Sequence, residues 1–214
     1  DASLRVGEQV RAIAAYRDAY QAAPNWSTAG VAYANALLVA GRLEESHQVA
    51  RLVISRGGVE RLQPFLMLAK TTFALRETGT PAELIPGGDI AAEIIDSLRQ
   101  IDEQIPNDPE VSSLLVRGWL VLGDLSAAKS FVYQTIVASD QSSADGGAGV
   151  DRLLALADIA RQRMPDLEEP LLDKAEEIGG PTVPLAFERA ELLARRGDFA
   201  GGLKVIDFAI ALKP

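Results

Sequence analysis

The 214-residue chain contains no cysteine and only one histidine, His47. The absence of cysteine excludes disulfides, zinc–thiolate sites and cysteine nucleophiles, although it leaves the cellular compartment, cytoplasmic or periplasmic, undecided. Cationic side chains are also scarce, with 21 Lys and Arg against 30 Asp and Glu and a net charge of −9. Because a nucleic-acid-binding protein should present a basic face, this balance argues against that class.

Long apolar runs are missing as well. No stretch approaches the roughly 20 apolar residues that a membrane-spanning helix needs, and we expect no direct membrane insertion. A charged-then-apolar leader typical of secretory signals is not found at the start of the sequence. Hydrophobic residues nevertheless make up 48% of the chain, enough for an extensive core, so disorder is excluded. Abundant alanine and an excess of Arg over Lys favour, on composition alone, a bacterial origin.

Motifs that carry catalysis are also absent. No HExxH, EF-hand, GxSxG or Walker sequence occurs. His47, between Ser46 and Gln48, is expected on the exposed side of a helix, where a lone histidine is solvated. Adjacent acidic pairs such as Glu44-Glu45 diverge by about 100° on a helix, so no two carboxylates are made to face one site. We therefore predict a non-catalytic protein without cofactor or metal.

Helical periodicity is the feature that the sequence does have, and it is clearest at the carboxyl end. From Ala186 onward, apolar residues recur at three- and four-residue steps, as on one face of a helix. Gly197-Asp198 interrupts this pattern, because glycine tolerates the left-handed conformation that ends a helix. A second helical pattern then runs from Phe199 to the terminal proline. Within it, offsets of four, three and five residues separate Gly202, Ile206, Ala209 and Pro214.

The same offsets occur near the amino end, at Ala12, Tyr16, Ala19 and Pro24. This pattern resembles the second helix of the tetratricopeptide repeat, a helix–turn–helix unit of about 34 residues whose tail reads A-x3-F followed by alanine and proline. Alanine lets paired helices approach closely, and the aromatic residue fills the gap beside it. The resemblance implies an all-α fold, a right-handed α-solenoid of about eleven helices and no β-sheet.

The array is expected to span residues 1–214. Its units are 7–24 (the second helix of a truncated repeat), 25–58 (a repeat capped by Ser27), 59–106 (an irregular repeat with an inserted turn, TPAELIPGG), 107–140 (a repeat capped by Asp108), 141–149 (a Gly/Ser loop), 150–181 and 182–214. Because only six residues precede Gly7, we expect the chain to begin in mid-repeat, as a segment of a larger bacterial protein. The inserted turn is interpreted as a neutral surface insertion in preference to a functional loop.

Two stretches allow alternatives. FVYQTIVAS at 131–139 is rich in β-branched residues and is compatible with a strand, but its place in a helical array favours a helix. DQSSADGGAG at 140–149 consists of glycine and short polar residues, which predict a flexible loop. Its GGAG segment lacks the preceding strand and following Lys-Ser/Thr of a phosphate-binding loop, so we favour a plain loop.

In tetratricopeptide arrays the first helix of each pair lines a concave surface that commonly holds a peptide. The resemblance places ten candidate residues there: Val31, Asn35, Leu38, Lys70, Phe73, Ser113, Arg117, Leu120, Phe187 and Glu191. Asn35 is the most suggestive, because an asparagine can pair with both the donor and the acceptor of a peptide backbone. For each residue, a solvated and non-binding face is the alternative. The cationic and amide residues are too spread out for the two-carboxylate clamp that binds chaperone tails.

Two functions remain open at this point. The first is a protein–protein interaction scaffold that binds a peptide or protein segment in the concave groove. The second is a structural spacer or self-association module within a larger multi-repeat protein. A solenoid needs polar faces at its ends, since each repeat buries its apolar side only against a neighbour. An uncapped end would therefore imply further repeats or a homodimer.

The last helix of the sequence lacks such a polar face. It carries two apolar stripes. We expect the first stripe to pack on the preceding helix, and the second to be uncovered and available for self-association. The first stripe consists of Phe199, Leu203, Ile206 and Ile210, and the second of Val205, Phe208 and Leu212.

Overall fold

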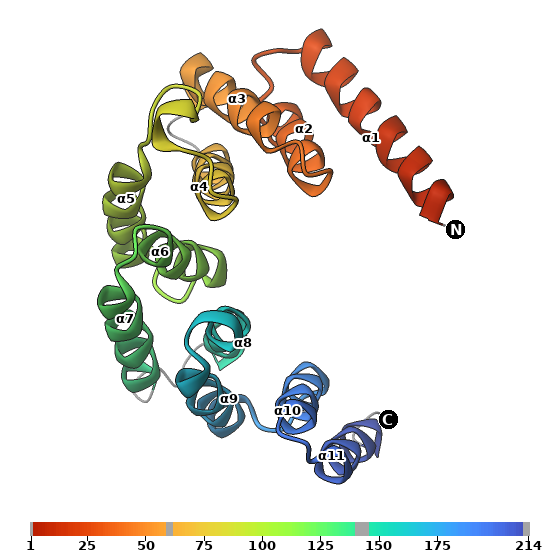
Figure 1. The fold of residues 1–214 in the computed structure, drawn as a ribbon, viewed down its shortest axis with the longest axis vertical. Helices are drawn as coiled ribbons and strands as arrows, with labels where there is room; N and C mark the ends of the chain where they lie inside the picture. The colour runs from red at the N-terminus through yellow and green to blue at the C-terminus, as the bar shows by residue number, and fades with distance from the viewer. Residues whose placement is uncertain (1, 59–61, 140–145, 212–214) are drawn as a thin grey trace. The chain divides into compact units, whose positions relative to one another are not determined.

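The computed structural model describes residues 2–58, 62–139 and 146–211. Within these ranges the fold is all-α, with eleven α-helices and no β-strand, which confirms the all-α prediction (Figure 1). The stretch FVYQTIVAS lies in helix α7 (Leu125–Ala138), so the helical interpretation of it is also confirmed. The chain forms two compact units, Asp1–Ile95 and Asp96–Pro214, and the boundary between them falls inside α5.

Unit 1 is built from four helices and the start of a fifth. They are α1 (Ala2–Ala22), α2 (Ser27–Val39), α3 (Leu43–Val53) with a short π-helix (Ile54–Gly58), α4 (Leu62–Glu77), a 3-10 turn (Ala82–Leu84) and the first residues of α5 (Ala91–Gln104). Unit 2 contains the rest of α5, α6 (Pro109–Val121), α7, α8 (Gly146–Arg163), α9 (Pro165–Gly179), α10 (Val183–Arg195) and α11 (Phe199–Ala211).

One type of turn recurs at the ends of four helices, at Gly41, Gly79, Gly123 and Gly197, where the glycine φ is +74°, +79°, +80° and +85°. In each turn the glycine N–H bonds to the carbonyl three residues back, and the next N–H bonds to the carbonyl five residues back. This is the Schellman motif, which requires the left-handed backbone that glycine adopts easily. After all but Gly79, the next helix begins two residues later. Three helix hairpins are therefore closed by the same turn.

The helix starts agree only in part with the sequence analysis. The Asp108 carboxylate accepts hydrogen bonds from the N–H groups of Glu110 and Val111, both at 2.9 Å, which confirms this cap. Ser27, in contrast, is the first residue of α2, and the capping position belongs to Trp26, which makes no side-chain capping bond. The assignment of Ser27 as a cap is therefore wrong, because the helix begins at Ser27 itself, one residue earlier than a Ser27 cap requires.

Two predicted helix boundaries are also corrected. The predicted second helix of the truncated repeat starts at Gly7, but α1 begins at Ala2 and continues through Gly7. Gly7 is not among the glycines with positive φ, so its backbone does not end the helix. The expected loop at 140–149 is likewise shorter, since Gly146 to Gly149 form the first turn of α8, whereas residues 140–145 lie outside the described part.

Close helix contacts in unit 1 depend on small residues. A Cβ at Gly30 on α2 would lie 2.2 Å from Val53 Cγ2 and 3.0 Å from Tyr20 Cε2, so three helices meet at this glycine.

In unit 2 the core centres on α8 and α9, where leucines from the two helices pack between one another. These include Leu153, Leu156, Leu171 and Leu172, all fully buried. On α1, in contrast, Ala12 is exposed and Tyr16 is 44% exposed. These two residues therefore do not form the close helix contact that the resemblance implied for them.

The inserted turn after α4 is fastened to unit 1 and does not lie loosely on the surface. Ile85 is only 2% exposed, so it anchors the segment in the core. Arg51 Nη1 on α3 donates a hydrogen bond of 2.6 Å to the Pro86 carbonyl oxygen. At the far end of the insertion, Arg76 on α4 pairs with Asp89 at 3.6 Å. The insertion therefore contributes to the stability of the unit.

His47 belongs to the same contact, and its predicted exposure is wrong. The side chain is fully buried on α3, and its Nε2 lies 3.1 Å from the Pro86 carbonyl oxygen, which can only accept. Nε2 therefore carries the proton, and the unprotonated Nδ1, 3.2 Å from Thr71 Oγ1, can only accept a hydrogen bond. Burial lowers the pKa of His47, the bond to Pro86 opposes this change, and the charge of Arg51 adds to it. The inserted turn covers this face of α3, which no local pattern could indicate.

The buried His47 should make the stability of the protein sensitive to pH. Since its pKa is lower in the folded than in the unfolded chain, its contribution is fully present above the unfolded value of about 6.5 and declines as the pH falls below it. We expect urea denaturation to give a smaller free energy of unfolding at pH 5.5 than at pH 7.5. In His47→Gln, which keeps a donor for Pro86 but does not titrate, this decrease should be weaker. Equal pH dependence in both proteins would contradict the role of His47.

Candidate functional site

The five groove candidates of unit 1 differ in accessibility. On α2, Asn35 is exposed, while Val31 and Leu38 are half-buried. On α4, Lys70 is half-buried, but Phe73 is 0% exposed. The Phe73 ring has no surface to offer a ligand, because α4 packs against both α2 and α3. We therefore assign Phe73 to the core and not to a groove.

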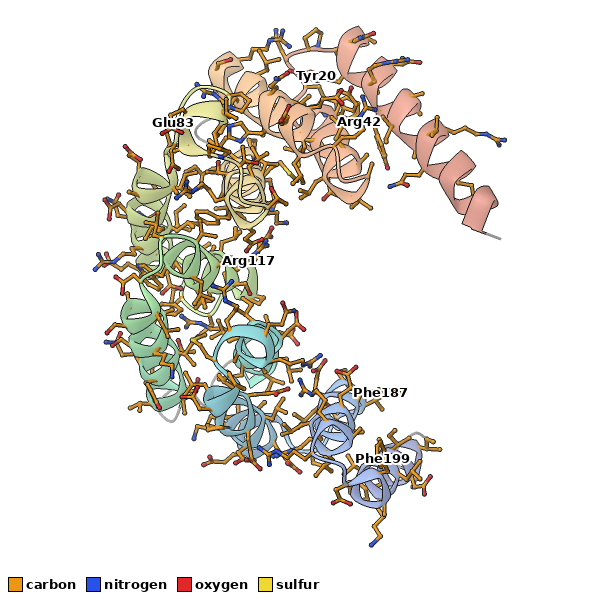
Figure 2. All side chains as sticks on the ribbon, in the orientation of Figure 1. Tyr20, Arg42, Glu83, Arg117, Phe187 and Phe199 are labelled. Carbon is orange, nitrogen blue, oxygen red and sulfur yellow. The ribbon has the colours of Figure 1, made fainter. Side chains whose placement is uncertain are left out.

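The candidates of unit 2 lie on α6 and α10. Ser113 Oγ donates its proton to the Pro109 carbonyl at 2.6 Å, and Leu120 is only 8% exposed, so Ser113 has no free donor and Leu120 has little surface to offer a ligand. Arg117 is half-buried, whereas Phe187 is 57% exposed. Figure 2 shows Arg117 and Phe187 projecting on the side of unit 2 away from α7. Of the aromatic groove candidates, Phe187 is thus the one presented at the surface.

Glu191 and its neighbours hold α10 against the rest of unit 2. Glu191 accepts a hydrogen bond of 2.6 Å from Arg161 Nη1 on α8. Arg161 Nε lies 3.2 Å from the buried Glu168 on α9, and its Nη2 contacts Glu188 on α10. Arg195 on α10 also bonds to Glu168. The resulting network connects α8, α9 and α10 and fixes the position of α10. Glu191 is part of this network through its ion pair with Arg161.

The packing of α11 on α10 corrects the predicted role of its first apolar stripe. Only Gly202 and Ala209 are buried on α11, and a Cβ at Gly202 would lie 3.2 Å from the Ala190 carbonyl oxygen. Because the helices close on these small residues, the larger ones are turned outward. Of the stripe that was expected to pack on the preceding helix, only Ile206 is half-buried. Its other members are exposed: Phe199 at 68%, Leu203 at 62% and Ile210 at 65%.

A groove runs along each side of the α10–α11 pair. We call the larger one, of about 230 Å³, the Phe208 groove; its apolar wall is formed by Leu185, Ala186, Val205 and Phe208, and its cations are Arg189 and Lys204. Phe208 is 54% exposed and Val205 is half-buried. Leu212, the third residue of the predicted self-association stripe, lies outside the described residues.

The smaller groove, of about 110 Å³, is named the Phe187 groove. It is lined by Val183, Ala186, Phe187, Ile206, Ala209 and Ile210, all of them apolar. Sequence reasoning identified Phe187 from the first-helix alignment, but it missed Val183 and Ile210. The sequence signal that could have located the groove is the pair of small residues Gly202 and Ala209. Their seven-residue spacing places them on one face of α11, the face that packs on α10. Ile206 and Ile210, at the margin of that face, then border a groove.

A polar cleft of about 490 Å³ lies elsewhere in unit 2, between α5, α6 and α7. Two of its carboxylates are engaged: Asp102 pairs with Arg152 Nη2 at 3.2 Å, and Asp124 caps α7 through the Ala127 N–H at 2.9 Å. Burial raises the pKa of Asp102, and the charge of Arg152 opposes this rise. The Arg152 guanidinium also stacks over the Phe131 ring, 5.4 Å from its centroid. These groups act as structural contacts and do not form a free acid–base pair.

Neither a metal centre nor a membrane span is found in the part of the chain that the structure describes. There, no three His, Cys, Asp or Glu side chains gather as metal ligands would. No helix in the same part is both long and apolar enough to cross a bilayer. The exposed Phe187 and the two grooves make the surface of the α10–α11 pair the candidate functional site. No family model matches the sequence, and the search of curated proteins likewise finds no match.

Proposed function

We propose that this chain is a non-catalytic interaction scaffold of tetratricopeptide-like repeats, which binds a peptide or protein segment. The observation that carries the proposal is the exposed Phe187 beside a groove lined only by apolar side chains. A right-handed solenoid is part of the same proposal, and the recurrence of one glycine turn after α2, α6 and α10 supports a repeat architecture.

The chemistry of the α10–α11 surface favours a macromolecular ligand. Aromatic residues that anchor protein interfaces lie in apolar surroundings, as Phe187 does between Val183 and Ile210. The two grooves, of about 230 and 110 Å³, are smaller than the roughly 300–1,000 Å³ of typical small-molecule pockets. Shallow apolar grooves beside an exposed aromatic ring fit a side chain of a longer segment. We expect micromolar affinity, about −8 kcal/mol.

Phe187→Ala should test this proposal directly. The probe is a peptide selected on the intact chain from a phage-displayed library, with its affinity measured by calorimetry. We expect Phe187→Ala to weaken binding about thirtyfold, since truncating an anchoring aromatic costs about 2 kcal/mol. If the segment extends toward α6, Arg117→Glu should weaken it as well.

Phe199→Ala is the matched control, because Phe199 is 68% exposed on the same helix pair but lines neither groove. It should leave the affinity unchanged. Equal effects of the two substitutions, or no effect of Phe187→Ala on any selected peptide, would contradict the proposed site. A role in self-association is the second candidate function, and the exposed Leu203, Phe208 and Ile210 of α11 favour it.

A further inference from the structure

The face of α11 that points away from α10 carries four exposed residues. Burial of Gly202 and Ala209 defines the inward side. At about 100° per residue, the opposite side presents Ala200, Lys204, Asp207 and Ala211, all of them exposed. We call these four residues the outward face. It combines two small side chains at its ends with one cation and one anion at its centre.

The order of these residues is symmetric about the middle of the helix. Read from either end, the spacing is four, three and four residues. In an antiparallel pair with an identical helix, Ala200 would therefore lie opposite Ala211, and Lys204 opposite Asp207. Each alanine would allow close approach, and two ion pairs would form by symmetry. Neither Lys204 nor Asp207 makes an ion pair with the residues that the structure describes.

Apolar side chains border the outward face on both edges. Leu203 and Ile210, 62% and 65% exposed, lie along one edge, and Phe208, 54% exposed, lies along the other. A two-fold axis places each edge of α11 next to the same edge of α11 in the second copy. Leu203 of one chain therefore lies next to Ile210 of the other. Exposed apolar residues gathered on one helix are typical of an interaction surface. In a two-fold contact the apolar edges of both copies would be buried against each other, around the paired charges at the centre.

We propose that two copies of this chain associate through antiparallel packing of α11 on α11, about a two-fold axis that passes between residues 205 and 206. The occupant of the outward face is a second copy, because its charges complement themselves in this arrangement. The contact shares Ile210 with the Phe187 groove, but Phe187 itself is not part of it.

Charge reversal tests the pairing of Lys204 with Asp207. In Lys204→Asp, two carboxylates face each other at both symmetric contacts, and in Asp207→Lys two ammonium groups do. Sedimentation equilibrium of the intact chain should show a dimer that each single substitution weakens by about tenfold or more. The combined substitution restores the pairs with their signs exchanged, so it should recover the wild-type dissociation constant. Phe187→Ala should leave the dimer unchanged, which separates this test from that of peptide binding.

Cross-linking tests the register, and the lack of cysteine provides a clean background. Ala200→Cys and Ala211→Cys should form a cross-link with a short bismaleimide when the two variants are mixed, and much less when each is alone. A wild-type chain that stays monomeric up to millimolar concentration would overturn the proposal. So would a dimer that tolerates both single reversals, or one in which Ala200→Cys alone cross-links as well as the mixture.

Discussion

Phe73→Ala is expected to lower the free energy of unfolding of unit 1 by about 3–5 kcal/mol, the usual cost of truncating a fully buried phenylalanine. Phe73 is 0% exposed and lies on α4, which packs against α2 and α3. The loss comes from removed apolar contacts and from the cavity that remains. Urea denaturation followed by circular dichroism, with hydrogen exchange to locate the opened helices, would measure it.

The matched control is Phe187→Ala, which removes an exposed phenylalanine. It should change the free energy of unfolding by less than about 0.5 kcal/mol, while weakening peptide binding. The two substitutions therefore separate stability from recognition. Near wild-type stability in Phe73→Ala would show that its ring is not part of the core, and would restore it as a groove residue.

Arg152→Met should have the second-largest effect, a loss of about 3 kcal/mol, because removing one partner of a largely buried ion pair leaves the other charge uncompensated. The Arg152 side chain is 9% exposed and that of Asp102 is 19% exposed. Arg152 Nη1 also donates to Asn107 Oδ1 at 3.0 Å, so α8 loses its link to the segment between α5 and α6. Methionine keeps most of the volume of the stem, so the loss reports on the guanidinium.

The pH dependence of this loss provides a further check. Burial already raises the pKa of Asp102, and removing the Arg152 charge should raise it more. A group with a raised pKa in the folded state contributes stability at low pH and loses it as the pH rises. The defect of Arg152→Met should therefore be smaller at pH 4 than at pH 7. Adding Asp102→Asn should recover part of the stability at pH 7, and simple additivity of the two substitutions would contradict a direct pairing.

The number and type of the helices could be predicted from the sequence because the signals that start and stop a helix are local. Gly41, Gly123 and Gly197 end their helices through a left-handed backbone that glycine favours. Asp108 begins α6 with its own side chain. These effects act within a few residues, so their consequences can be read without knowing what packs around them.

The candidate site could be predicted only in part. Phe187 follows from aligning the first helices of the repeats, but the grooves beside it require knowing which face of α11 meets α10. Hydrophobic periodicity marked two stripes on that helix and assigned the larger residues to the contact. The small residues Gly202 and Ala209 form it instead, because close approach of the backbones excludes bulky side chains.

By itself the sequence determined an all-α chain, the glycine turn at Gly197 and the absence of cysteine. Only the tertiary structure decided which side of each helix is buried: His47 and Phe73 lie inside, while Phe199, Leu203 and Ile210 lie outside. The reason is physical. Helix formation depends on neighbours in the sequence, whereas burial depends on residues far along the chain, such as Pro86, whose carbonyl oxygen lies 3.1 Å from His47 Nε2.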